Sequence, residues 1–131
     1  MPFRLDSVRT AILERDFQTF GRQAEMEAIS FHIITMTSPF HSENGWNSGA
    51  YYWLPESLEI MLAVQKWRSN GLEVYFTLDA GPTVHLLCLR KGLSQVLSAI
   101  HGIESLQTER KWDLLINSPS EGARIIKDEI L

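Results

Sequence analysis

The stretch of residues 74–89 constrains the fold more than any other part of the chain. Two apolar runs rich in β-branched and aromatic residues, Val74–Leu78 and Val84–Leu89, flank a carboxylate and the breaker pair Gly81-Pro82. This pattern predicts an antiparallel hairpin. Asp79 comes where the first strand ends, so the sheet can fix its carboxylate, while the small residues Ala80 and Gly81 let a ligand approach the backbone. The spacing therefore predicts a site at the turn.

The first part of the chain has the periodicity of two helices. Apolar residues recur at helical spacing over Asp6–Arg15 and again over the longer stretch Phe17–Met36, which predicts a packed helical pair. Gly21 lies inside the second helix and weakens it slightly. The stretch Thr37–Gly49 is rich in Ser, Pro, Asn and Gly, so we expect it to be the longest loop.

The second part of the chain alternates strand and helix signals around the hairpin. We expect a strand at Ala50–Leu54, helices at Glu56–Asn70 and Leu93–Ile100, and a last strand at Trp112–Asn117. The predicted class is α+β, with the β-α-β-β-α-β order of a ferredoxin-like split antiparallel sheet, helices on one face and two helices before it. Ser118–Leu131 is compatible with a loop followed by a helix or a strand.

Composition excludes several classes of function. The 131 residues fit one domain with a real core, being 44% hydrophobic and 21% charged. The net charge of −4 and the lack of a basic stripe argue against nucleic-acid and membrane-surface partners. No run approaches the ~18 apolar residues of a membrane span. The lone cysteine, Cys88, lies in an apolar run and fits a reducing compartment, so we expect a cytoplasmic protein.

The hairpin stretch also carries a family resemblance. The sequence YFTLDAGPTVHLL resembles the signature of diphosphomevalonate decarboxylases, members of the GHMP kinase superfamily, whose pattern there is close to DAGPN. The similarity extends upstream through Ala11–Phe20 and Glu25–His32, and weakly downstream to Gly122-Ala123. It covers nearly the whole chain but only the carboxyl-terminal half of such enzymes. The resemblance implies that residues 1–131 are a single GHMP-kinase-type C-terminal domain without the nucleotide-binding N-terminal domain.

The resemblance also implies roles for individual residues. Asp79 would be the catalytic carboxylate, lying next to the tertiary hydroxyl of mevalonate 5-diphosphate and orienting or deprotonating it for attack on ATP. Ala80, Gly81, Ser30 and His32 would bind substrate. From the residues alone, an aspartate beside Gly-Pro is commonly a plain turn residue, and a lone helical histidine is more often a packing residue.

One position departs from the family, and two kinds of site are not predicted. The family usually has Asn where this chain has Thr83, so a hydrogen bond from that amide is in doubt. The four histidines have no metal-ligand spacing, and we predict no protein-bound metal. The glycine-rich sequence GWNSG, at residues 45–49, lacks the Lys-Ser/Thr pair of a phosphate loop.

Function follows as an expectation with open alternatives. The resemblance implies an ATP- and magnesium-dependent lyase of the mevalonate pathway, forming isopentenyl diphosphate for isoprenoid biosynthesis. This chain alone would bind neither cofactor and would be inactive until a missing N-terminal domain or split subunit completed it. Alternatives are a non-catalytic module for dimerisation or small-ligand binding, and part of a mevalonate-type kinase. A homodimer is a further option, since the surface left by the missing domain would be apolar.

Overall fold

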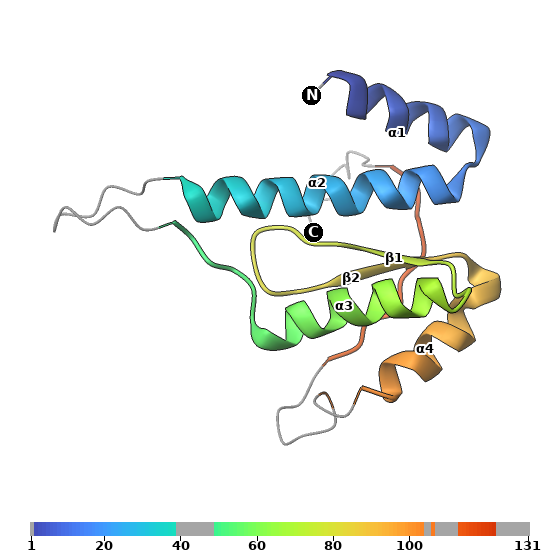
Figure 1. Cartoon of the computed structure of the whole chain (residues 1–131). Coiled ribbons are helices and arrows are strands. Elements are labelled where there is room, and N and C mark those ends of the chain that lie inside the picture. Colours follow the sequence, from blue (N-terminus) through green and yellow to red (C-terminus); the bar gives the residue numbers. More distant parts are fainter. Residues whose placement is uncertain (1, 39–48, 104–105, 107–112, 123–131) are drawn as a thin grey trace, which may run out of the picture.

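The chain folds as an α+β domain, which confirms the predicted class. The computed structural model (Figure 1) describes residues 2–38, 49–103, 106 and 113–122. Within these ranges the elements are α1 (Pro2–Glu14), α2 (Phe17–Thr37), α3 (Pro55–Ser69), β1 (Val74–Thr77), β2 (His85–Cys88), the 3₁₀ helix η1 (Arg90–Gly92) and α4 (Leu93–His101). Most of the predicted loop at Thr37–Gly49, Trp112 and the end of the chain lie outside the described residues. None of the described helices is both long and apolar enough to cross a membrane.

The predicted hairpin is confirmed, with Val74 opposite Cys88 and Thr77 opposite His85. Among the described residues, however, the sheet has only these two antiparallel strands. The strand predicted at Ala50–Leu54 is wrong: these residues belong to no strand, and the Ala50 N–H donates to the Thr35 carbonyl of α2 at 3.0 Å. Residues 113–117 are likewise not in a strand and are exposed to solvent.

The core lies where α2, α3 and α4 meet the hairpin. Figure 1 shows the hairpin between α2 and the pair α3 and α4, so the two helices predicted to cover the sheet lie on the same side of it. Alternate residues of β1 and its extension point into this core, as the period of a strand requires. The buried cluster consists of Ala28, Met61, Val64, Val74, Phe76, Leu78 and Val96.

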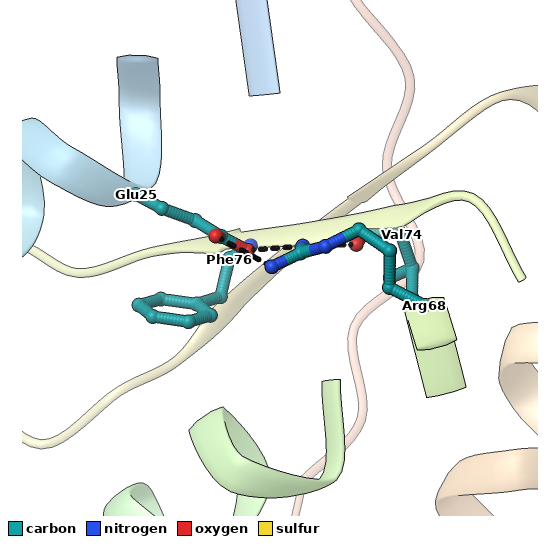
Figure 2. A network of polar contacts seen from close by, with 4 residues as sticks. All are labelled: Glu25, Arg68, Val74 and Phe76. Atoms are coloured by element: carbon teal, nitrogen blue, oxygen red, sulfur yellow. Dashed lines mark hydrogen bonds and ion pairs between the residues drawn. The ribbon is translucent and has the colours of Figure 1, made fainter. Parts of the chain in front are cut away.

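Two side chains cover the free edge of β1 (Figure 2). The Phe76 N–H donates to Glu25 Oε1 at 3.2 Å, and Arg68 Nη1 donates to the Val74 carbonyl at 2.9 Å. The guanidinium of Arg68 also forms two hydrogen bonds with the Glu25 carboxylate, at 2.7 and 2.9 Å. Unpaired strand edges normally invite further pairing. Here α2 and α3 supply the missing partners, which fixes both helices to β1.

A buried stripe of α2 follows β1 along its length. The stripe is Gly21, Glu25, Ala28 and His32, spaced so that one helical face turns inward. Gly21 meets Tyr75, Glu25 meets Phe76, and His32 faces the backbone of Asp79. From Gly21 to His32 the helix rises about 16 Å, and from Tyr75 to Asp79 an extended strand covers a similar length of about 13 Å. The two elements therefore run together, and α2 delivers His32 to the turn that follows β1.

Gly21 is where α2 approaches the strand most closely. A Cβ at this position would lie 2.1 Å from Cδ2 of Tyr75. The Tyr75 ring is 1% exposed and has little room to move, since Phe17 packs on it edge-to-face at 5.5 Å and the Arg68 guanidinium lies 4.7 Å from its centroid. Glycine is thus required by tertiary packing, at the expense of helix propensity.

We expect Gly21→Ala to lower the free energy of unfolding by about 2 kcal/mol, because overpacking a filled core typically costs about 1–3 kcal/mol. Helix propensity alone predicts the opposite sign, a gain of about 1 kcal/mol. Urea unfolding distinguishes them. Gly92→Ala is the control, since a Cβ there meets nothing within 4 Å, and its effect should be below about 1 kcal/mol. A stabilised Gly21→Ala variant would contradict the packing described here.

Candidate functional site

The turn between β1 and β2 presents Asp79 to solvent. Leu78 is buried and anchors the end of the strand, whereas Asp79 and Ala80 are exposed. Gly81 has φ of 137°, a conformation that side chains with a Cβ rarely adopt. The breaker predicted from the sequence therefore has a definite role: it lets the chain reverse immediately after the carboxylate.

An open cavity of about 200 Å³ adjoins this turn. Its lining residues are Asp79, Ala80, Gly81, Thr83 and His85. The Asp79 carboxylate makes no hydrogen bond or ion pair with any described residue, so it remains available as an acceptor. The cavity thus combines a carboxylate, a hydroxyl, an imidazole and exposed backbone groups, a set able to bind a small polar ligand and accept its proton.

Ser57, at the start of α3, holds the far end of the turn. Its hydroxyl donates to the Pro82 carbonyl at 2.7 Å and accepts the Leu54 N–H at 3.3 Å, and the residue is 1% exposed. From its position in the sequence, Ser57 is expected only to lie at the start of the helix predicted over Glu56–Asn70. The available signal was a serine in the first turn of α3, but nothing local indicates that its hydroxyl reaches a residue 25 positions away.

His32 lies beneath the near end of the turn. The residue is 1% exposed, and its ring packs against Tyr52 and Trp53 with centroid separations of 5.9 and 5.2 Å. Burial lowers the pKa of the imidazole, and the backbone of Asp79 raises it by a smaller amount. His32 therefore lies next to Asp79 but does not line the cavity.

Ser30 lies on another face of α2, directed at α1. Its hydroxyl donates to the Met26 carbonyl at 2.7 Å and accepts a hydrogen bond from Arg4 Nη1 at 3.2 Å. Arg4 also pairs with Glu27 at 2.6 Å. The structure thus brings Ala80, Gly81 and His32 close to Asp79, whereas Ser30 joins two helices. A substrate-binding role for Ser30 remains a prediction.

Burial of His32 makes stability depend on pH. The unfolded chain binds a proton near pH 6.5, whereas the lowered pKa keeps the folded chain neutral, so the free energy of unfolding should fall as the pH drops below about 6.5. The slope is at most about 1.4 kcal/mol per pH unit and ends at the folded-state pKa. Urea unfolding midpoints between pH 7.5 and 5.5 measure this dependence of stability on pH. His32→Gln should flatten this pH profile. A profile equal to that of the parent chain would refute the assignment.

Comparison with known proteins identifies one family. Residues 1–128 match the family described as "Mevalonate 5-diphosphate decarboxylase C-terminal domain". Two curated relatives carry related names. A "Phosphomevalonate decarboxylase" of Haloferax volcanii is 30% identical over 74% of this chain. A "Diphosphomevalonate decarboxylase" of Saccharomyces cerevisiae is 27% identical over 77% of it. The chain covers only 28% and 24% of these relatives.

Solved structures agree with the sequence matches. A mevalonate diphosphate decarboxylase of Enterococcus faecalis, described for its ATP binding, has a TM-score of 0.65 and 29% identity, covering 78% of this chain and 29% of that one. A complex described as containing MVAPP, AMPPCP and magnesium has a TM-score of 0.66 at the same identity and coverage. Sequence and fold thus point to the same family.

Proposed function

The chain belongs to the mevalonate 5-diphosphate decarboxylase C-terminal domain family, and from this membership we propose that it supplies the catalytic carboxylate, Asp79, to an ATP-dependent decarboxylation of mevalonate 5-diphosphate. The observation that carries the proposal is the position of Asp79, at the end of β1 beside an open cavity, with a carboxylate free of partners among the described residues. A group with this placement can reach a hydroxyl held in the cavity.

The chemistry assigned to Asp79 is acceptance of one proton. Its carboxylate orients and deprotonates the tertiary hydroxyl of the substrate, whose oxygen then attacks the γ-phosphorus of ATP and displaces ADP. Cleavage of the C–O bond to the new phosphate, together with loss of carbon dioxide, gives isopentenyl diphosphate. Ala80 and Gly81 border the cavity, and we assign their backbone N–H groups to the diphosphate of the substrate.

The nucleotide-binding part is assigned to another domain or subunit. The chain spans about a quarter of the curated relatives it matches, so it supplies a portion of what those proteins contain. The described residues hold no group of three or more His, Cys, Asp or Glu side chains suited to a metal. No step is therefore assigned to a metal held by these residues.

A second candidate substrate is mevalonate 5-phosphate. The observation that favours it is the relative at 30% identity, which is named a phosphomevalonate decarboxylase. The two substrates differ by one phosphate and share the tertiary hydroxyl and the carboxylate that leaves. The role of Asp79 is the same for both, and only the contacts to the phosphate end differ.

The proposal predicts that the 131-residue chain alone shows no turnover and that an added nucleotide-binding half restores it. A single acid/base group contributes about 10²–10⁴ in rate, below the ~10⁶ or more of ordinary enzymes. The assay follows ADP and carbon dioxide with each substrate. Equal amounts of both products support a decarboxylase, ADP alone supports a kinase, and steady turnover by the chain alone would contradict the division of the site.

A further inference from the structure

We infer that His32 and Ser57 are positioning residues: they hold the backbone of the Asp79 turn at its two ends, so that the carboxylate faces the cavity in one orientation. The inference deepens the proposed function and rests on it for the role of Asp79. It assigns His32 to the support of the turn and adds Ser57, which lies 22 residues before Asp79 in the sequence and is joined to the turn only by the fold.

The Ser57 contact is complete in the structure. Its hydroxyl uses both of its hydrogen-bonding functions, donating to Pro82 at 2.7 Å and accepting from the Leu54 N–H at 3.3 Å. Because Ser57 is 1% exposed, water does not compete for either bond. The start of α3 is thus tied to the last part of the turn, on the far side of Gly81 from the carboxylate.

The role of His32 is inferred from its two buried ring nitrogens. Both ring nitrogens of His32 are buried and have no hydrogen-bond partner among the described residues, and the same holds for Nε1 of Trp53. Buried polar groups left unpaired are strongly disfavoured. The backbone of Asp79 lies close enough to the ring to raise its pKa, although burial outweighs this effect.

A neutral imidazole suits both neighbours. It carries one donor and one acceptor nitrogen. As part of the inference we assign the donor to the Asp79 carbonyl and the acceptor to the indole N–H of Trp53, whose ring centroid is 5.2 Å from that of the imidazole. A protonated ring would carry two donors and could not accept the indole hydrogen. The buried stripe of α2, fixed to β1 by Glu25 and Gly21, sets the position of the ring.

These two contacts matter because no other described residue bonds the Asp79 carboxylate. Between them lie Ala80 and Gly81, the latter at φ of 137°, and the Asp79 side chain has no described partner of its own. Its direction therefore depends on the backbone. A displacement of about 1 Å at a reacting group can cost about 10²-fold in rate.

The test on the chain itself compares backbone order at residues 79–81 by ¹⁵N relaxation. In the parent chain we expect order parameters near the ~0.85 of rigid backbone, falling below about 0.6 in His32→Leu and Ser57→Ala. His32→Gln keeps an N–H donor and should restore the order. A packing role predicts the reverse, since leucine fills the apolar site better than glutamine does. Ser69→Ala, an exposed serine of α3 bonded to its own helix, is the control for Ser57→Ala.

Kinetics in the protein completed by its nucleotide-binding half provide a second readout. Positioning predicts that His32→Leu and Ser57→Ala lower kcat about 10–100-fold while KM for the substrate stays within about twofold. A direct substrate contact would raise KM instead. Unchanged order at residues 79–81 in both variants would overturn the inference. If the completed parent protein has no activity, the proposed function fails, while the relaxation data still decide whether the turn is held as described.

Discussion

Replacing Asp79 by asparagine is expected to lower kcat by about 10²–10⁴-fold in the protein completed by its nucleotide-binding half, because the amide has nearly the same shape but cannot accept the hydroxyl proton. KM should change little, since the backbone N–H groups of Ala80 and Gly81 remain. The carboxylate is exposed and unpaired among the described residues. The free energy of unfolding of the chain should therefore stay within about 0.5 kcal/mol of the parent.

The two readouts separate chemistry from folding. Product formation measured at saturating substrate gives kcat, and urea unfolding of the isolated chain gives stability. Asp6→Asn is a matched control, because Asp6 is an exposed aspartate in α1, far along the sequence from the cavity. It should leave both quantities unchanged. Turnover by Asp79→Asn at the parent rate would remove Asp79 from the mechanism.

Replacing Glu25 by alanine is expected to lower the free energy of unfolding by about 3 kcal/mol. The change leaves the Arg68 guanidinium without its carboxylate. It also leaves the Phe76 N–H without an acceptor, and Phe76 is only 1% exposed. Breaking a buried ion pair from one side costs about 3–5 kcal/mol. We take the lower end because the side chain of Arg68 is 25% exposed, so water compensates in part.

A second ion pair provides the control for this prediction. Glu27 pairs with Arg4 at 2.6 Å, but its side chain is 54% exposed. Exposed pairs contribute about 0–1 kcal/mol, so Glu27→Ala should cost less than 1 kcal/mol. In a double-mutant cycle, Glu25→Ala and Arg68→Ala should be non-additive, because each already removes their shared bonds. If Glu25→Ala and Glu27→Ala lowered the free energy of unfolding equally, the bonds at the edge of β1 would contribute no more than an exposed ion pair.

Covering that edge also links stability to the site. Glu25 and His32 belong to the same buried stripe of α2, and the first is bonded to β1 while the second lies beneath the turn that β1 leads into. A variant that loosens α2 from the strand should therefore also disturb the backbone of Asp79. Glu25→Ala is expected to lower turnover only through the fraction of folded protein and the order of this turn.

The sequence by itself determined the elements whose signals are local. The hairpin, the turn with Asp79 and Gly81, and the helices α2 to α4 follow from periodicities and breakers within a few neighbouring residues. It also carried the family, because a short run such as YFTLDAGPTVHLL is specific. This short run does not specify which side chains from the rest of the chain pack against one another.

Only the tertiary structure decided contacts between residues distant in sequence. Glycine at position 21 reads as a weakness of α2 until the Tyr75 ring is seen against it. Ala50–Leu54 has the aromatic content of a strand, yet the Ala50 N–H bonds to α2 and the Leu54 N–H bonds to the Ser57 hydroxyl of α3. Strand pairing and side-chain burial depend on the whole chain, since a pleated surface forms only where another strand is free to pair.

The difference between local and long-range contacts also explains which site residues could be placed from the sequence. Asp79, Ala80 and Gly81 could be placed from the sequence because they adjoin one another in a single turn. Ser30 and His32 are two residues apart, but on a helix this spacing puts them on different faces, so one meets Arg4 and the other reaches Asp79. Which face turned inward was set by how α2 packs on β1, and no local pattern encodes that choice.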